Sequence, residues 1–177
     1  MDNKALVLAI SALAAVTFVV QSAYMQSSHA QSCNEGDVLA VFSPDNSEEI
    51  FGLLGSAKRE IKLEVYEFSY TALADALIDA RSRDVSVHIV LEPSVAANTQ
   101  MSQYLLNGGV SVAWASKKFH NTHSKFAVID DNVVLVGSTN WSKNAMLYNR
   151  EASVVVYSAD VARSFEGIFD SDYAAGR

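Results

Sequence analysis

His123 and Lys125 are the two residues whose types and spacing most clearly indicate chemistry. They stand one residue apart at an alternating stretch, residues 124–129, that predicts a β-strand, so both side chains should leave the same face. A histidine beside a fixed ammonium suits phosphate chemistry, because the imidazole can attack phosphorus or move a proton while the lysine holds the anionic oxygens. The alternative is a solvated histidine and lysine on an edge strand.

Polar residues further along the chain favour the catalytic interpretation. Residues 137–142 contain a glycine, hydroxyls and an amide suited to binding phosphate oxygens, among them Ser138 and Asn140. Glu151 opens a later predicted strand, where its carboxylate could accept a hydrogen bond from an imidazole. Asp130 lies at the far end of the strand that carries the His-x-Lys pair. We therefore expect Asp130 to fix a turn or a neighbouring positive group rather than to bind the same phosphate.

Several other side chains near the pair could touch a substrate. Lys117, Lys118 and His120 precede it by a few residues, although a histidine in a polar loop is more often only solvated. Trp141 could line a pocket, and burial is an equal alternative. Cys33 is the only cysteine, so a cysteine-rich zinc site is excluded, and we expect neither a metal nor a cofactor.

Aromatic and acidic residues at the ends of two predicted strands leave alternatives open. Tyr66, Phe68 and Tyr70 could form a surface on which bases stack, but core packing is the favoured interpretation. Glu92, at the end of another strand, could face a cleft, although an exposed acid near a turn needs no function.

The complete pattern resembles the signature of the phospholipase D superfamily: His123-x-Lys125-x4-Asp130, then Gly137-Ser138-x-Asn140, then Asn149-x-Glu151. A short chain with a single such motif is similar to the small exported bacterial endonucleases of that superfamily. The resemblance implies a metal-independent phosphodiesterase whose histidine forms a covalent phosphohistidine that water resolves, while a second histidine acts as acid and base.

Carried onto this chain, the resemblance assigns a role to each matching residue. It implies that His123 is the nucleophile, that Lys125, Ser138 and Asn140 bind the phosphate, and that Glu151 orients the imidazole. Asp130 belongs to the motif, and we assign it a structural role. Larger members carry two motifs in one chain, so the single motif here implies a homodimer of twofold symmetry in which the second histidine comes from the partner subunit.

The charge distribution bears on the substrate. A net charge of -7 is unexpected for a protein that binds a polyanion, but residues 117–151 hold five bases and only three acids. Our first hypothesis is therefore a sequence-nonspecific endonuclease acting on DNA, with RNA as a further substrate. The alternatives are a phospholipid phosphodiesterase of the phospholipase D or cardiolipin hydrolase type and, ranked last, an inert phosphate-binding module.

The amino-terminal segment bears on location. Residues 5–20 carry no charge, a run that is short for a membrane span but typical of a secretory signal peptide. We expect residues 1–30 to be a signal peptide or an uncleaved anchor, residues 31–37 a linker, and residues 38–177 the phosphodiesterase domain. A cleaved leader predicts an exported, periplasmic protein; an anchor through residues 5–20 would place it on a membrane.

The rest of the chain must position the motif. Strands and helices alternate up to residue 115, and the turn at residues 130–132 then predicts a hairpin. This order predicts an α/β/α sandwich with a mixed, mainly parallel sheet and one motif per chain. The expected strands are 38–43, 61–66, 85–91, 110–115, 124–129, 133–136 and 152–157, and the expected helices are 48–58, 71–83, 98–107 and 159–170.

Overall fold

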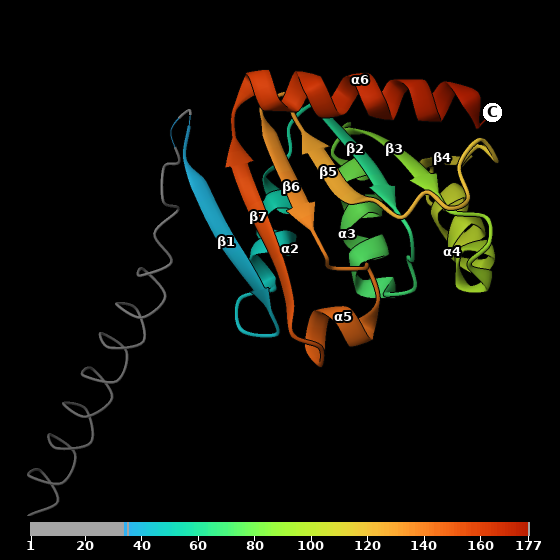
Figure 1. The fold of residues 1–177 in the computed structure, drawn as a ribbon, viewed down its shortest axis with the longest axis horizontal. Helices are drawn as coiled ribbons and strands as arrows, with labels where there is room; N and C mark the ends of the chain where they lie inside the picture. The colour runs from blue at the N-terminus through green and yellow to red at the C-terminus, as the bar shows by residue number, and fades with distance from the viewer. Residues whose placement is uncertain (1–33, 35, 177) are drawn as a thin grey trace, which may run out of the picture. The chain divides into compact units, whose positions relative to one another are not determined.

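The computed structural model describes Asn34 and residues 36–176 (Figure 1). The predicted leader, most of the predicted linker and Cys33 lie outside the described residues, so these assignments stay predictions. Within the described part of the chain, no helix has the length and apolar character needed to cross a bilayer.

One mixed sheet forms the centre of the fold, with the strand order β1-β7-β6-β5-β2-β3-β4. The strands are β1 (Val38–Ser43), β2 (Glu60–Val65), β3 (Ser86–Leu91), β4 (Ser111–Trp114), β5 (Lys125–Ile129), β6 (Val133–Gly137) and β7 (Glu151–Tyr157). The predicted mixed sheet is confirmed, but the expectation that parallel pairs dominate is wrong. Among the strands of the described residues, only β2–β3 and β3–β4 pair in parallel, because the β5–β6 hairpin and the return of β7 make the remaining pairs antiparallel.

Helices cover both faces of this sheet, as the sandwich prediction requires. One face packs against α2 (Glu48–Ser56), α3 (Thr71–Ser82) and α4 (Ala96–Asn107), and the other against α6 (Ala159–Ala175), which runs across the strands (Figure 1). The short helix α5 (Lys143–Leu147) was not predicted. Ser142 begins it by accepting a hydrogen bond from the Ala145 amide at 3.3 Å.

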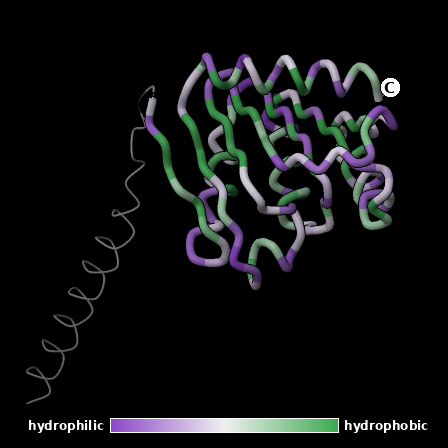
Figure 2. The backbone as a smooth tube through the Cα atoms, viewed as in Figure 1, coloured by the Kyte–Doolittle hydropathy of each residue, from purple (hydrophilic) through white to green (hydrophobic). Residues whose placement is uncertain are grey.

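Most strands are largely apolar, as Figure 2 shows, whereas β2 alternates apolar residues with Glu60, Lys62 and Glu64. In β5 every residue is buried, with Ala127 and Ile129 packed on the side of α2–α4, and Phe126 and Val128 on the side of α6. Both faces of β5 are therefore covered, and β5 lies between β6 and β2. The edge-strand alternative for the His-x-Lys pair is thus wrong.

The topology brings one terminus of each of the seven strands to one end of the sheet, which we call the His123 end, and there the end of β1 lies opposite Glu151. Lys125 at the start of β5 lies opposite Val65 at the end of β2, and Gly137 at the end of β6 lies opposite Ser153 near the start of β7. The carboxyl ends of β3 and β4 join them, since both strands run parallel to β2. The opposite end, where β2 starts and the β5–β6 turn lies, is the Glu60 end.

Candidate active site

The predicted pair lies together at the start of β5. The Lys125 side chain is 8% exposed, and its Nζ lies 2.9 Å from Nδ1 of the exposed His123. The same Nζ donates to the His123 carbonyl at 2.6 Å. The ammonium can only donate, so its bond to the His123 carbonyl fixes the backbone of the pair. The geometry thus places the imidazole and the ammonium side by side, as phosphate chemistry requires.

Tyr66 supports this pair from the end of β2. Its ring centroid lies 4.3 Å from that of His123 and 5.1 Å from Nζ of Lys125. Its backbone amide also donates to the carbonyl of Ser124 at 3.0 Å. Of the three aromatic residues left open by the sequence, Phe68 is fully buried, whereas Tyr66 is half-buried against the catalytic pair.

The electrostatics of Lys125 set it apart from an ordinary lysine. Burial lowers its pKa, and the nearby carboxylates of Glu151 and Glu67 oppose that shift only in part. Among the described residues, no carboxylate lies close enough to form an ion pair with it. A desolvated cation without an ion-pair partner is ready to receive an anion. Glu67 had no sequence signal, since it stands outside every motif.

Ser138 and Glu151 meet where β6 approaches β7. Gly137 makes the approach possible, because a Cβ there would collide with Ser153 and with the carbonyl of Ala152. The Ser138 hydroxyl donates to Glu151 Oε2 at 2.6 Å and accepts from the Ala152 amide at 3.1 Å.

Glu151 accepts hydrogen bonds from two neighbouring side chains, one in its own loop and one after β6. Its Oε1 accepts from Nδ2 of Asn149 at 3.1 Å, while Oε2 accepts from Ser138. Within the described chain it makes no hydrogen bond to His123, so the predicted orienting contact is not formed inside one subunit. Its carboxylate still acts on the site, because it helps to hold the charge of Lys125.

Asn140 faces the site from the loop after β6. Its Nδ2 lies 3.5 Å from Glu67 Oε2, and its buried Oδ1 has no hydrogen-bond partner. Buried amide oxygens are usually paired, and the exceptions gather where a ligand or water is expected. Asn140 therefore has an unpaired amide oxygen close to Glu67, and Glu67 in turn lies near Lys125.

Trp141 is a packing residue, which corrects the expectation that it could touch substrate. The residue is 2% exposed and lies edge-on to Phe68, with the ring centroids 5.2 Å apart. Its backbone amide donates to the Glu67 carbonyl, and its carbonyl accepts from Ser69 and Tyr70. Trp141 thus joins the loop after β6 to the loop after β2.

Asn98 is a positioning residue that sequence reasoning missed. It is fully buried, and its Nδ2 donates at 2.8 Å to the carbonyls of both Tyr66 and Glu92. Its Oδ1 accepts from the amide of Phe68 at 2.8 Å. One amide side chain thereby fixes the ends of β2 and β3 relative to each other. An asparagine at the start of a predicted helix gives no sequence signal for this role.

The loop between β4 and β5 carries the other predicted substrate contacts. Lys117, Lys118 and His120 are all exposed and line a pocket of about 580 Å³. Glu92 lies on the same pocket and is buried, not exposed as the simpler interpretation assumed. Burial acts to raise its pKa, but hydrogen bonds from Ser94 and Thr122 outweigh it and hold that pKa below the usual value.

Asp130 lies at the Glu60 end, away from the pair. Its carboxylate accepts the backbone amides of Lys58 at 2.8 Å, Arg59 at 2.7 Å and Glu60 at 3.0 Å. The residue has a φ of 53°, a left-handed conformation that aspartate tolerates better than most residues. These contacts agree with the structural role that we expected.

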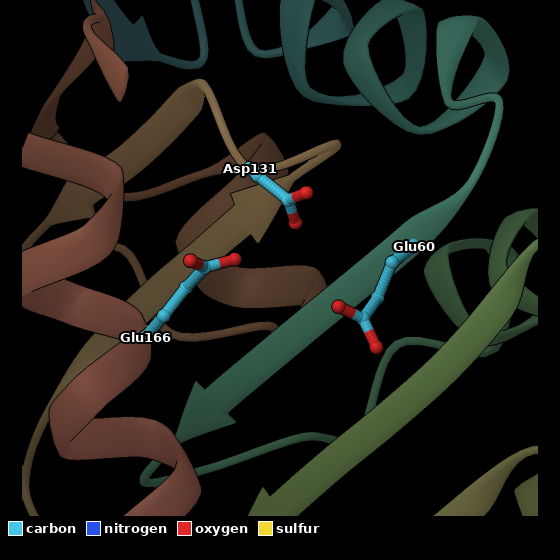
Figure 3. Close-up of side chains that lie close together, drawn as sticks. All are labelled: Glu60, Asp131 and Glu166. Carbon is cyan, nitrogen blue, oxygen red and sulfur yellow. The ribbon is translucent and has the colours of Figure 1, made fainter. Parts of the chain in front are cut away.

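Three further carboxylates converge at the Glu60 end, those of Glu60, Asp131 and Glu166 (Figure 3). One oxygen of each lies within 4.8 Å of the others. Lys62 Nζ already lies 3.4 Å from Glu60 and 3.8 Å from Glu166, and Arg59 donates to Asp131 at 2.7 Å. These cations account for the cluster as an ion network.

Comparisons with known proteins point to one family. A family model described as "Cardiolipin synthase, PLD-like domain" matches residues 50–173. The mitochondrial cardiolipin hydrolase of Xenopus laevis is 34% identical over 119 residues, which are 67% of this chain and 56% of that protein. A phospholipase D of Rickettsia bellii is 29% identical over 112 residues, 63% of this chain and 56% of that protein. The chain thus spans about half the length of these curated relatives.

Two solved structures of similar fold are matched along nearly their whole length. Nuc from Salmonella typhimurium, a phospholipase D family member, superposes with a TM-score of 0.76 at 28% identity, covering 81% of this chain and 97% of that one. NucT from Helicobacter pylori superposes with a TM-score of 0.71 at 21% identity, over 80% of this chain and 98% of that one, which supports the fold alone.

Proposed function

Because the chain belongs to the phospholipase D superfamily and is thus a phosphodiesterase, we propose that it is a metal-independent, sequence-nonspecific endonuclease. Its substrate would be DNA, with RNA as a further substrate. The observation that carries this choice is the exposed basic loop with Lys117, Lys118 and His120, which leads directly into His123. Positive charge beside the reacting residue suits a phosphate backbone, although the whole protein is acidic.

The proposed reaction uses the His123–Lys125 pair directly. A ring nitrogen of His123 attacks phosphorus, the P–O bond to the leaving strand breaks, and a phosphohistidine forms. The departing oxygen takes a proton from a second histidine, which then removes a proton from the water that cleaves the P–N bond. Lys125, with its buried ammonium, would stabilise the negative charge that develops on the phosphate oxygens.

The second histidine in this scheme would be His123 of the partner subunit. Among the described histidines, none other lies at the pair: His88 packs on Tyr173 and lies 3.7 Å from Glu60, and His120 lies near Glu92. His123 is exposed in the single subunit. A residue that meets its own copy across a twofold axis has to be exposed before the two subunits associate. A homodimer with one composite site satisfies both observations.

Substrate choice and nucleophile are tested together. Purified parent and His123→Ala proteins are incubated with plasmid DNA, RNA and phospholipid vesicles in the presence of a chelator. We expect the parent to cleave nucleic acid and the variant to lose at least about a thousandfold in rate, as for other nucleophile removals. His88→Ala, at the opposite end of the sheet, is the matched control and should stay active. Cleavage that stops in chelator contradicts the metal-free mechanism.

The composite site is tested by mixing subunits. Parent and His123→Ala chains are unfolded together, refolded in varied ratios and assayed on DNA. If each site needs both copies of His123, activity should fall with the square of the parent fraction. A linear fall, or an active monomer in light scattering, would contradict the shared site.

A lipid phosphodiesterase is the second candidate, and one feature favours it. An apolar pocket of about 490 Å³ lies beside Lys125 and is lined by Phe126, Val136, Phe165 and Ile168. Such a surface could receive an acyl chain, and the 34% identical relative is named a cardiolipin hydrolase. Under this alternative Ile168→Ser, at an exposed position, would slow vesicle hydrolysis and leave DNA cleavage unchanged.

We also infer export through the predicted leader. Expression of the full chain in a bacterial host, followed by fractionation and amino-terminal sequencing, tests it. A periplasmic product beginning near Gln31 is expected, whereas an intact chain in the membrane fraction would support the anchor through residues 5–20.

A further inference from the structure

The pocket at the carboxyl ends of β3 and β4 lies outside the catalytic groups described above. Its wall is the loop from Ser116 to His120, and its other side is the Glu92–Ser94 segment. Within this loop Phe119 is 52% exposed, although phenylalanine is normally a core residue. Lys118 Nζ lies 5.4 Å from the centroid of its ring. An exposed ring flanked by cations is the arrangement on which proteins stack bases of unpaired strands.

We propose that this pocket, with Phe119 as its stacking platform, is a binding subsite for an unpaired nucleobase of the substrate strand. The inference rests on the proposed nuclease function and extends it, because it predicts a preference for single-stranded over duplex substrate. Bases inside a duplex are already stacked on their neighbours and offer no free face to a protein ring.

The charge within the pocket decides which part of a nucleotide enters. Glu92 forms part of the pocket, and the hydrogen bonds from Ser94 at 3.0 Å and Thr122 at 2.8 Å stabilise its ionised form. A carboxylate repels a phosphate but tolerates a neutral base with amino donors. The phosphates should therefore follow the exposed Lys117 and Lys118.

The pocket is also tied to the catalytic residue. Glu92 holds the amide of Thr122, the residue before His123, and the Ser94 hydroxyl donates to Oδ1 of Asn121 at 3.3 Å. Phe119 is four residues from His123, a span of at most about 14 Å when fully extended. If a base is held on Phe119, a phosphate only a few nucleotides away along the same strand would lie next to His123.

The test measures steady-state kinetics of Phe119→Ala and Phe119→Trp on three substrates: a single-stranded oligonucleotide, the same strand made abasic, and its duplex. One stacked base is worth roughly tenfold or more in affinity. We expect Phe119→Ala to raise KM for the base-containing single strand by about that factor, with little change for the abasic strand, the duplex or a small chromogenic phosphodiester. Phe119→Trp should restore the parent KM, because indole also stacks.

Phe42→Ala is the control, since Phe42 is also exposed, at 44%, but lies on β1 at the other edge of the sheet. Equal KM values for parent and Phe119→Ala, or equal losses on base-containing and abasic strands, would overturn the subsite. Binding of the same labelled strands to each variant in a His123→Ala background gives a readout that needs no cleavage. If the strands bind but the parent does not cut them, the proposed nuclease activity is contradicted and the base-binding subsite is not. If the strands do not bind, both proposals are contradicted.

Discussion

Charged side chains lie at both ends of the central sheet, but they are paired at the Glu60 end and partly unpaired at the His123 end. At the Glu60 end, Asp130 accepts three backbone amides, and Lys62 lies among Glu60, Glu166 and Asp170 at 3.1–3.8 Å. At the His123 end, the buried Lys125 has no ion-pair partner among the described residues, and Asn140 keeps a buried oxygen unpaired.

The difference separates groups that stabilise the fold from groups that serve a ligand. A buried cation without a partner costs stability, and its pKa falls for that reason. Such a cost persists where a binding or catalytic function requires it. The charged groups of the Glu60 end are paired with one another, whereas the Lys125 ammonium at the His123 end is left for an anion such as a phosphodiester.

Among the charged residues of the two ends, Lys125→Gln should have the largest effect. Removal of one preorganised charge that faces a developing anion typically lowers the rate by about a hundredfold to a thousandfold. Because the buried ammonium has no ion-pair partner among the described residues and a glutamine amide can still donate to the His123 carbonyl, we expect the thermal midpoint to stay unchanged or to rise. The measurements are kcat on single-stranded DNA and thermal denaturation of the same preparation. If the variant lost stability in proportion to activity, Lys125 would be a residue that stabilises the fold, like the charged residues of the Glu60 end.

Asp130→Asn should give the next largest effect, on stability alone. An asparagine can still accept from Arg59 and Glu60, but its amide nitrogen would face the Lys58 amide, donor against donor. We expect the free energy of unfolding to fall by about 2 kcal/mol in urea, with kcat of the folded enzyme retained. Asp131→Asn is the matched control, because its contact to Arg59 is solvent-exposed and worth less than about 1 kcal/mol. Equal losses in both variants would contradict the special place of Asp130.

Much of this contrast could be predicted from the sequence, because the motif residues are local. His123 and Lys125 meet through their two-residue spacing at the start of β5, and the strand and helix order is confirmed apart from α5. The dominance of antiparallel pairs was not predicted, since alternation of strands and helices does not fix where the later strands enter the sheet.

What the sequence could not reveal are contacts between segments far apart in the chain. Asn98 joins the ends of β2 and β3, and Glu67 faces Asn140 from 73 residues away. The sequence left open whether Glu92 faces a cleft or lies exposed near a turn, and the loop before His123, which folds back onto it, decides for the buried position on the pocket. Such roles depend on tertiary pairing, for which the local residue pattern carries no signal.

Glu64 allows the comparison to be sharpened, because it is a buried carboxylate at the His123 end. It is the second-last residue of β2, is 2% exposed, and accepts a hydrogen bond from the hydroxyl of Ser124, which stands between His123 and Lys125. Burial raises the pKa of Glu64 to about 7, and the nearby Asp172 adds to the rise while Ser124 opposes it. Its Oε2 is buried without a partner.

The sign of the pH effect follows from this raised pKa. Between about pH 4.5 and pH 7 the folded state binds more protons at Glu64 than the unfolded state, so stability should fall as the pH rises through that window. Glu64→Gln should remove this slope and raise the free energy of unfolding at pH 8 by about 2 kcal/mol. Urea denaturation at pH 5 and pH 8 measures it. Identical slopes for parent and variant would show that Glu64 is not the titrating group.

Lys62→Met, which removes a cation of the Glu60 end, should give the smallest effect. The side chain is 14% exposed and its stem can be replaced by methionine, but Glu60, Glu166 and Asp170 would lose their shared cation. Because Lys62 is partly solvated, we expect a loss of only about 1 kcal/mol, smaller at high salt. Activity per folded molecule should match the parent, since the Glu60 end holds none of the reacting groups. A fall in kcat at unchanged stability would mean that the two ends of the sheet are coupled, and that the Glu60 end does more than stabilise the fold.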